Sequence, residues 1–167
     1  MNEFLRYAAK DDIDLLFEWA NDKETRQNSF TANQISYQEH QKWFSKMLSD
    51  PSCMQFIYMA GDLPIGQIRL SVEGDTAEIS YSVNPSFRKK GYGKKMLSAL
   101  QRKIKADHPG IRKLTAKVKP TNEASKKIFT TAGFSQTYAS YEIVLDKIDD
   151  LYEINGTASF ETANDNA

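Results

Sequence analysis

The sequence predicts an α/β fold with six to seven strands and about four helices. Short segments in which apolar and polar residues alternate predict the strands, and longer segments with apolar residues three and four apart predict the helices. The chain has 167 residues, 40% of them hydrophobic, and a chain of this size buries about two-thirds of its unfolded surface. We therefore expect a single domain over residues 1–155. Small and polar residues dominate afterwards, which predicts a disordered tail over 156–167.

The first third of the chain is expected to form one strand and two helices. Residues 4–7 are typical of a strand. Asp11 is followed by apolar residues at helical spacing, so a helix is expected to begin there. A polar stretch over 21–33 separates it from a second helix, at whose start Ser36 and Glu39 have the spacing of a capping box.

Three strands are expected in the middle of the chain. The first two cover about 54–60 and 64–72, and the intervening Gly61-Asp62 is typical of a hairpin turn. The third covers 77–83 and ends before Pro85, which has no N–H to donate. Its side chains alternate between two faces. The apolar face carries Ala77, Ile79, Tyr81 and Val83, and the polar face carries Glu78, Ser80 and Ser82.

The segment after the third strand is typical of an anion-binding turn. Arg88, Lys89 and Lys90 lead into Gly91-Tyr92-Gly93, and an amphipathic helix is expected over 92–107. Small residues let backbone N–H groups converge on one point. Free N–H groups at a helix N-terminus, with cations nearby, favour a phosphate or pyrophosphate.

This turn matches one of three known phosphate motifs. A dinucleotide fingerprint requires a third glycine where Met96 stands, and a P-loop requires Ser or Thr where Lys95 stands. What remains is V-x-P-x-x-R-x-x-G-x-G, from Val83 to Gly93. It resembles the acetyl-CoA signature of the GNAT N-acetyltransferase superfamily.

A second segment resembles the same superfamily. A strand is expected over 113–119, and a helix follows it up to Thr131. The run P-x-N-x-A-S-x-x-x-F-x-x-A-G-F begins at Pro120 and resembles the fifth strand and fourth helix of the superfamily. There an Asn and a small hydroxyl residue contact the cofactor's pantetheine arm and phosphates, which implies Asn122 and Ser125 here. From the residues alone, Asn122 could also be a plain helix N-cap.

The resemblance implies a GNAT fold, in which helices cover the two faces of a mixed central sheet, and acetyl-CoA as the cofactor. Backbone groups near Val83 are implied to bind the pantetheine and orient the thioester carbonyl, as an oxyanion hole does. The residues implied to contact the cofactor are Tyr81, Ser82, Val83, Arg88, Lys89, Lys90, Gly91, Tyr92, Gly93, Lys94, Asn122, Ser125 and Phe129.

Glu78 is our candidate general base. It lies on the polar face of its strand, five residues before Val83, and related acetyltransferases of the phosphinothricin type have a catalytic Glu at this point. A carboxylate can accept the proton that an ammonium group must lose before it attacks a thioester. The alternative is that Glu78 forms a salt bridge to a neighbouring strand, through Arg69.

Phe129 departs from the pattern of the superfamily. Many members have a Tyr there that protonates the departing thiolate, but Phe has no proton to give. Tyr138 and Tyr141 are the candidate replacements, on a last strand or hairpin expected over 134–145. Tyr81 or water is the alternative donor.

The N-terminal third resembles acetyltransferases that act on the amino sugars of UDP-linked sugars in flagellin-glycan and related pathways. The resemblance lies in four short motifs: E-W-A-N-D from Glu18, T-R from Thr25, N-S-F from Asn28 and H-x-x-W-F from His40. The residues implied to contact the acceptor are Arg26, Asn28, Phe30, His40 and Trp43. Arg26 would pair with a diphosphate, and the aromatic rings would stack on a uracil or sugar. The alternatives are helix packing for Trp43 and a surface or capping position for His40.

We therefore predict an N-acetyltransferase that moves the acetyl group of acetyl-CoA to the primary amine of a nucleotide-linked amino sugar, within a ternary complex. Two other functions remain open. One is a protein N-terminal acetyltransferase of the ribosomal-protein type, and the other is an acyl-CoA-binding sensor without turnover.

Composition disfavours nucleic acid and membrane as partners, and a small-molecule amine is the expected substrate. The net charge of zero disfavours a nucleic-acid partner, and no apolar run approaches the roughly eighteen residues of a membrane helix. Cys53 is the one cysteine, so no intrachain disulfide is possible, and a cytoplasmic location is expected. At the start of a strand, Cys53 is expected to be a buried small hydrophobe and not a nucleophile. No metal is expected, and a homodimer stays open.

Overall fold

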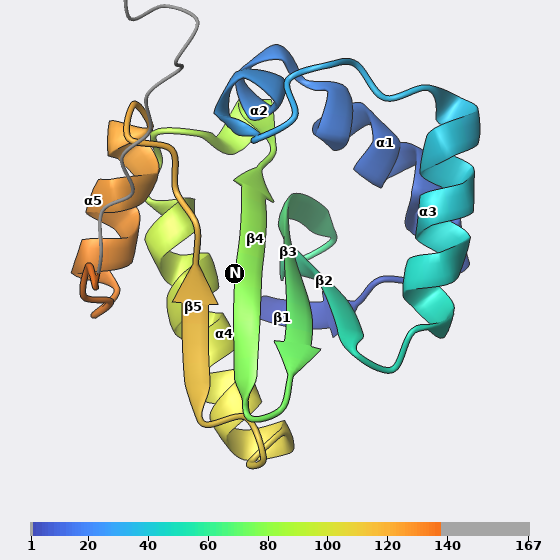
Figure 1. Cartoon of the computed structure of the whole chain (residues 1–167). Coiled ribbons are helices and arrows are strands. Elements are labelled where there is room, and N and C mark those ends of the chain that lie inside the picture. The colour runs from blue at the N-terminus through green and yellow to red at the C-terminus, as the bar shows by residue number, and fades with distance from the viewer. Residues whose placement is uncertain (1, 138–167) are drawn as a thin grey trace, which may run out of the picture. The chain divides into compact units, whose positions relative to one another are not determined.

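The computed structural model describes residues 2–137, which contain a five-stranded mixed sheet and five α-helices (Figure 1). The strands are β1 (Glu3–Tyr7), β2 (Cys53–Ala60), β3 (Leu63–Glu73), β4 (Thr76–Val83) and β5 (Lys113–Ala116). The helices are α1 (Ile13–Asn21), α2 (Lys23–Asn28), α3 (Tyr37–Ser49), α4 (Tyr92–Asp107) and α5 (Glu123–Thr131). The strands follow the order β1-β2-β3-β4-β5, with β4 and β5 parallel and the other neighbours antiparallel.

Most of the expected elements are confirmed, with three differences. The helix α2 lies inside the stretch 21–33, which we expected to be a polar connection. It forms there because the Asp22 side chain accepts a hydrogen bond from the Thr25 amide and caps the helix. The strand expected over 113–119 ends at Ala116. The sheet has five strands within the described residues, not six to seven, and most of the last strand expected over 134–145 lies outside them.

Helices pack on both faces of the sheet, although Glu78 and Ser80 of β4 are exposed on the face that carries α1 and α3. On one face, the side chains of β2–β4 pack with α4 and α5 around residues such as Ile68, Met96 and Leu97. On the other face, α1 and α3 pack on β2 through Trp19 and Phe44. Successive residues of β2 therefore enter different cores. This explains why β2 is almost wholly apolar and does not alternate with polar residues.

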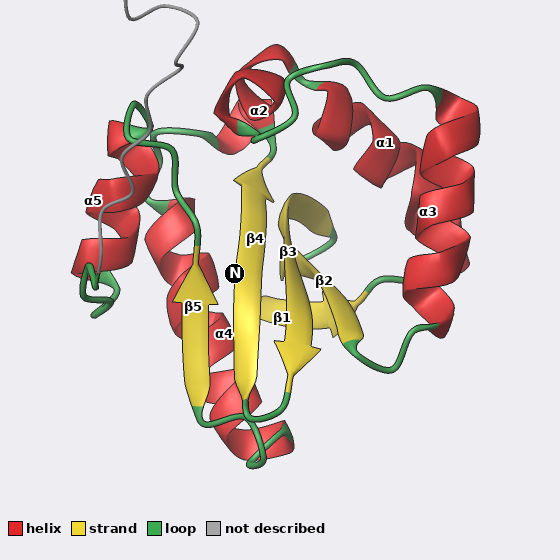
Figure 2. Cartoon of the chain, in the orientation of Figure 1, coloured by secondary structure: helices red, strands yellow, loops and turns green. Residues whose placement is uncertain are grey.

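The sheet opens between β4 and β5. Their parallel pairing ends at the pair Ile79 and Ala116, whereas β4 continues to Val83 and stays paired with β3. Figure 2 shows β5 ending part-way along β4, whose C-terminal end reaches α2. The segment 80–83 therefore has one strand edge without a β5 partner, and its backbone groups on that edge are open to a ligand.

Gly66 keeps β3 and β4 close to α4 beside this opening. A Cβ at this position would lie 2.6 Å from the Ser82 carbonyl oxygen and 2.8 Å from the Met96 Cε atom. A bulge next to it leaves Ile65 without a partner on β2. The backbone oxygen of Ser82 cannot move away without breaking the pairing of β3 with β4.

We predict that Gly66→Ala lowers the free energy of unfolding by about 1–3 kcal/mol, as overpacking of a filled core does. Gly110→Ala is the matched control, because a Cβ there meets nothing within 4 Å, and its effect is expected to stay within about 0.5 kcal/mol. Urea denaturation measures both. Equal stability of the two variants would contradict the proposed close approach.

Candidate active site

A cleft of about 1160 Å³ occupies the opening between β4 and β5. Residues from both faces of β4 line it, including Ser80 and Ser82 from one face and Tyr81 and Val83 from the other. The cleft therefore passes through the sheet at the point where the strands separate. The loop between β4 and α4 and the helix α5 border one part of it, and α2, α3 and the strands β2 and β3 border the other.

The loop between β4 and α4 has the backbone shape of an anion site. Lys89 and Gly91 both have positive φ, 60° and 82°. Left-handed residues in a short turn direct successive N–H groups to one side, as in anion-binding nests. Gly91 is the N-cap of α4 and offers no side-chain cap. The first amides of α4 are therefore available to a pyrophosphate.

The side chains expected in this loop have different surroundings. Lys89, Gly91, Tyr92, Gly93 and Lys94 line the cleft. Lys90 is not among the lining residues, because its Nζ atom donates to the Ser86 carbonyl oxygen at 2.9 Å.

The two glycines of the signature have different tasks. Gly91 is required by its positive φ, with no atom near its missing Cβ. Gly93 is buried, and a Cβ there would lie 2.8 Å from the Cδ1 atom of Ile128. From the sequence, both glycines were expected to let the backbone N–H groups of the turn converge on one point. The structure assigns Gly93 to the close packing of α4 against α5.

Arg88 connects the loop between β4 and α4, called the cofactor loop below, to α2. Its guanidinium forms ion pairs with Asp22 and Glu24 and donates to the Thr25 hydroxyl. Its Nε atom donates to the Val83 carbonyl oxygen at 3.1 Å. Burial raises the pKa of Asp22, but the hydrogen bonds from Arg88 and Thr25 outweigh it and hold that pKa below its usual value. The side chain of Arg88 is thus occupied by its partners in the protein. We therefore expect its contact with the cofactor to come from its backbone.

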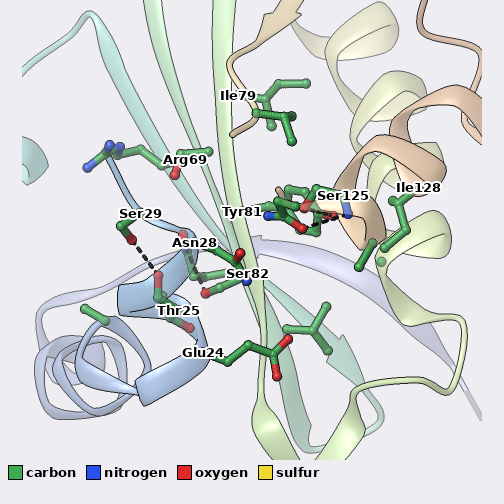
Figure 3. A pocket seen from close by; sticks show the side chains of 18 of the residues that line it. Glu24, Thr25, Asn28, Ser29, Arg69, Ile79, Tyr81, Ser82, Ser125 and Ile128 are labelled. Carbon is green, nitrogen blue, oxygen red and sulfur yellow. Dashed lines mark hydrogen bonds between the residues drawn. The ribbon is translucent and has the colours of Figure 1, made fainter. Parts of the chain in front are cut away.

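On the α5 side, Tyr81 and Ser125 form a polar pair inside the cleft. The Tyr81 hydroxyl lies 3.1 Å from the Ser125 Oγ atom, as Figure 3 shows. Burial raises the pKa of Tyr81, and the hydrogen bond with Ser125 opposes that rise. Phe129 packs edge-on against the Tyr81 ring, 5.5 Å between centroids. The Asn122 side chain accepts from the Ser125 amide at 3.0 Å, so Asn122 is the N-cap of α5 as well as a lining residue.

The floor of the cleft carries a chain of hydrogen bonds that we did not expect. Gln55 Nε2 donates to Gln67 Oε1 at 2.6 Å, and Gln67 Nε2 donates to Ser82 Oγ at 3.2 Å. The chain crosses β2, β3 and β4 on the face opposite α4. A signal for it exists in the sequence, because Gln55 interrupts the otherwise apolar β2 and Gln67 lies on β3 at a position that shares its face.

Glu78 has a different partner from the one expected. Its carboxylate pairs with Lys117, in the segment after β5, at 2.8 Å, and both side chains are about half exposed. The expectation of a bridge to Arg69 is therefore wrong. The Arg69 guanidinium lies instead over the Trp43 ring, 5.3 Å from its centroid.

All five residues expected to contact the acceptor line the cleft. Phe30 is 68% exposed at its border. The Arg26 guanidinium, however, donates to the Ser29 hydroxyl at 3.0 Å and to the Thr31 and Asn33 carbonyl oxygens. These bonds shape the loop after α2 and occupy the Nη atoms that would pair with the diphosphate predicted from the sequence, whereas the buried Nε atom has no hydrogen-bond partner among the described residues.

His40 is 2% exposed, so the surface or capping position we considered for it is wrong. Its Nε2 atom lies 3.0 Å from the Ile13 carbonyl oxygen, which can only accept, so Nε2 carries a proton. Burial lowers the pKa of His40, so the ring is neutral at pH 7. Trp43 both packs on His40 and lines the cleft.

The candidate proton donors Tyr138 and Tyr141 lie outside the described residues.

Known proteins share this architecture. The family described as Acetyltransferase (GNAT) domain matches residues 4–135. The chain belongs to the GNAT acetyltransferase family. It is 25% identical, over 124 residues, to an uncharacterized N-acetyltransferase of Bacillus subtilis (strain 168), YfmK, covering 74% of this chain and 79% of that one.

Solved structures show the same fold. An aminoglycoside acetyltransferase, AAC(6')-Ib, in complex with coenzyme A superimposes with a TM-score of 0.72 at 23% identity, covering 81% of this chain and 86% of the other. A spermidine N-acetyltransferase of Vibrio cholerae, in complex with CoA and spermine, has a TM-score of 0.73 at 18% identity and covers 81% and 82%.

Family membership makes this chain an N-acetyltransferase that depends on acetyl-CoA. Within residues 2–137, no group of His, Cys, Asp and Glu is arranged to bind a metal ion. None of the helices described is both long and apolar enough to span a bilayer.

We predict that Gly91→Val raises the Kd for acetyl-CoA at least about tenfold, because a β-branched residue cannot keep the left-handed conformation that directs the loop amides. Gly74→Val is the control, since Gly74 has a φ of 60° and equally open surroundings, but lies in the β3–β4 turn. Calorimetry measures both affinities. An unchanged Kd in a folded Gly91 variant would contradict the assignment of the loop.

Proposed function

We propose that this acetyltransferase acts on the primary amine of a small acceptor that carries negative charge, and that a nucleotide-linked amino sugar is that acceptor. One observation supports this most. Among the described residues that line the cleft, the two carboxylates are both ion-paired, Glu24 with Arg88 and Glu78 with Lys117. Arg26 and Arg69 add positive charge to the part bordered by β3 and α2. Spermine and kanamycin, bound by structural neighbours, are polycations, which such a cleft would repel.

The reaction we propose is a direct transfer. The neutral amine attacks the thioester carbonyl, an N–C bond forms, the C–S bond breaks, and coenzyme A leaves as a thiolate. Backbone N–H groups at the open end of β4, near Val83, would stabilise the oxyanion. Cys53, the one cysteine of the chain, is not among the lining residues, and its Sγ atom lies 3.9 Å from Asp50 Oδ2. This favours a ternary complex over an acetyl-enzyme.

The acceptor nitrogen loses two protons in this reaction, one when the ammonium becomes a neutral amine and one after the N–C bond has formed. We propose Glu78 as the acceptor of the first. Five residues of extended strand separate Glu78 from Val83, about 16 Å at ~3.3 Å per residue, so the proton would travel through water. The departing thiolate gains a proton from a donor side chain, which the second nitrogen proton then reprotonates. Among the described residues, Tyr81 is the phenol beside Phe129 and Ser125, and we propose it as the donor.

An acceptor panel tests the proposed function. Acetyl-CoA is incubated with UDP-linked amino sugars, spermidine, kanamycin and a peptide with a free N-terminus, and release of free thiol is followed. The UDP-linked amino sugar is expected to have the highest kcat/KM. Turnover of the peptide alone would favour the protein N-terminal acetyltransferase, and preference for spermidine or kanamycin would contradict the charge argument.

We predict that Glu78→Gln binds acetyl-CoA normally and loses about 10²–10⁴ in kcat, the usual contribution of a general base. The loss is expected to shrink at high pH, where more of the amine is already neutral. Glu73→Gln on the neighbouring strand is the matched control, because Glu73 is exposed and outside the cleft. A Glu78 variant with the wild-type rate near pH 7 would show that the base lies elsewhere.

A further inference from the structure

We infer that Arg69, supported by Trp43, is the subsite that binds the phosphate or diphosphate of the acceptor. This inference rests on the proposed function and locates its negatively charged group. It also differs from the sequence-based prediction, which assigned that group to Arg26. Figure 3 shows Arg69 on one side of β4, with Asn28 of α2 and the following Ser29, and Tyr81 with Ser125 on the other side.

Arg69 occupies the middle of the cleft floor. It pairs across the sheet with Ser80 of β4 and with Gln55 of β2. Both of these neighbours line the cleft, as Arg69 itself does. A group bound at Arg69 therefore has neutral hydroxyl and amide side chains beside it, which add hydrogen bonds. The carboxylate on the same face of β4, Glu78, is two residues from Ser80 and is paired with Lys117.

The donors of Arg69 are available to a ligand. Among the residues that the structure describes, no carboxylate lies within ion-pair distance of its guanidinium, which lies over the Trp43 ring. The ring attracts the cation electrostatically but takes none of the N–H groups as an oxygen acceptor would. Packing on an indole also limits the conformations of the long side chain. A guanidinium held in this way can bind two phosphate oxygens at once.

The other cations that line the cleft either have partners within the protein or lie on its cofactor side. Arg26 donates to loop oxygens, Arg88 pairs with Asp22 and Glu24, and Lys117 pairs with Glu78. Lys89, Lys94 and Lys127 belong to the cofactor loop, α4 and α5. Arg69 is thus the arginine that can serve an acceptor, within the described part of the cleft.

The position of Arg69 also suits the length of such an acceptor. Val83 pairs with Gly66, three residues before Arg69 on the same strand. The two positions are therefore about 10 Å apart at ~3.3 Å per residue. A sugar ring whose amine reaches the thioester near Val83 can place a phosphate on its far side over Arg69.

The test compares acceptors that differ only in charge. Glucosamine, glucosamine 1-phosphate and UDP-glucosamine are assayed with acetyl-CoA for the wild type, Arg69→Gln and Arg69→Lys. We expect Arg69→Gln to raise KM about 10–100-fold more for the two phosphorylated acceptors than for glucosamine, because only the phosphorylated acceptors lose an ion pair. Arg69→Lys should recover part of the loss, because it keeps the charge but not the fork of donors. Arg112→Gln, an exposed arginine outside the cleft, is the matched control.

A binding experiment separates this inference from the proposed function. UDP and inorganic pyrophosphate are titrated calorimetrically into each variant with saturating coenzyme A present, so that the cofactor loop is occupied. Binding to the wild type and a loss of at least about tenfold in Arg69→Gln would support the subsite even if no amine were acetylated. Tighter binding of UDP than of pyrophosphate would identify a nucleotide. Equal affinity in the wild type and Arg69→Gln, or equal changes in KM for charged and neutral acceptors, would overturn the inference.

Discussion

The active site depends on the early end of the pairing between β4 and β5. Because the pairing ends at Ile79 and Ala116, the segment 80–83 keeps one strand edge open while β3 holds the other. A buried strand edge normally costs free energy unless its polar groups are satisfied. Here the open edge borders a cleft that a ligand can fill, so the missing strand contacts become ligand contacts. The position of the loop, the floor and α5 around the cleft follows from this separation.

Arg88 connects the cofactor loop to α2, which borders the other part of the cleft. This arginine belongs to the signature of the cofactor loop, yet its guanidinium pairs with the N-terminal end of α2 and with the Val83 carbonyl oxygen. The helix α2 leads directly to the loop that Arg26 shapes. A displacement of the cofactor loop would therefore disturb α2 and the acceptor part of the cleft. The charges that secure this frame are paired within the protein, whereas Arg69 has no ion pair among the described residues.

Two pairs of identical residues show how the surroundings of a residue change its role. Gly91 and Gly93 belong to one motif, but the first permits a left-handed turn and the second permits contact between α4 and α5. From the sequence, Arg26 was expected to bind the acceptor, and Arg69 was considered only as a salt-bridge partner of Glu78. Carbonyl and hydroxyl oxygens close by in the sequence accept from the Arg26 Nη atoms, although its buried Nε atom has no hydrogen-bond partner among the described residues. The Arg69 guanidinium lies over the ring of Trp43, which comes from a different element.

The sequence by itself determined the local elements and the cofactor loop. Alternation predicted β4, helical spacing predicted α4, and the spacing from Val83 to Gly93 predicted the anion site between them. These features depend on residues close together along the chain. The tertiary structure alone decided the pairing of Glu78 with Lys117, the hydrogen-bonded chain from Gln55 to Ser82, and the end of β5 at Ala116. Each of these brings together residues from different strands, and contacts between strands depend on register and on the competition among all available partners, which no local pattern records.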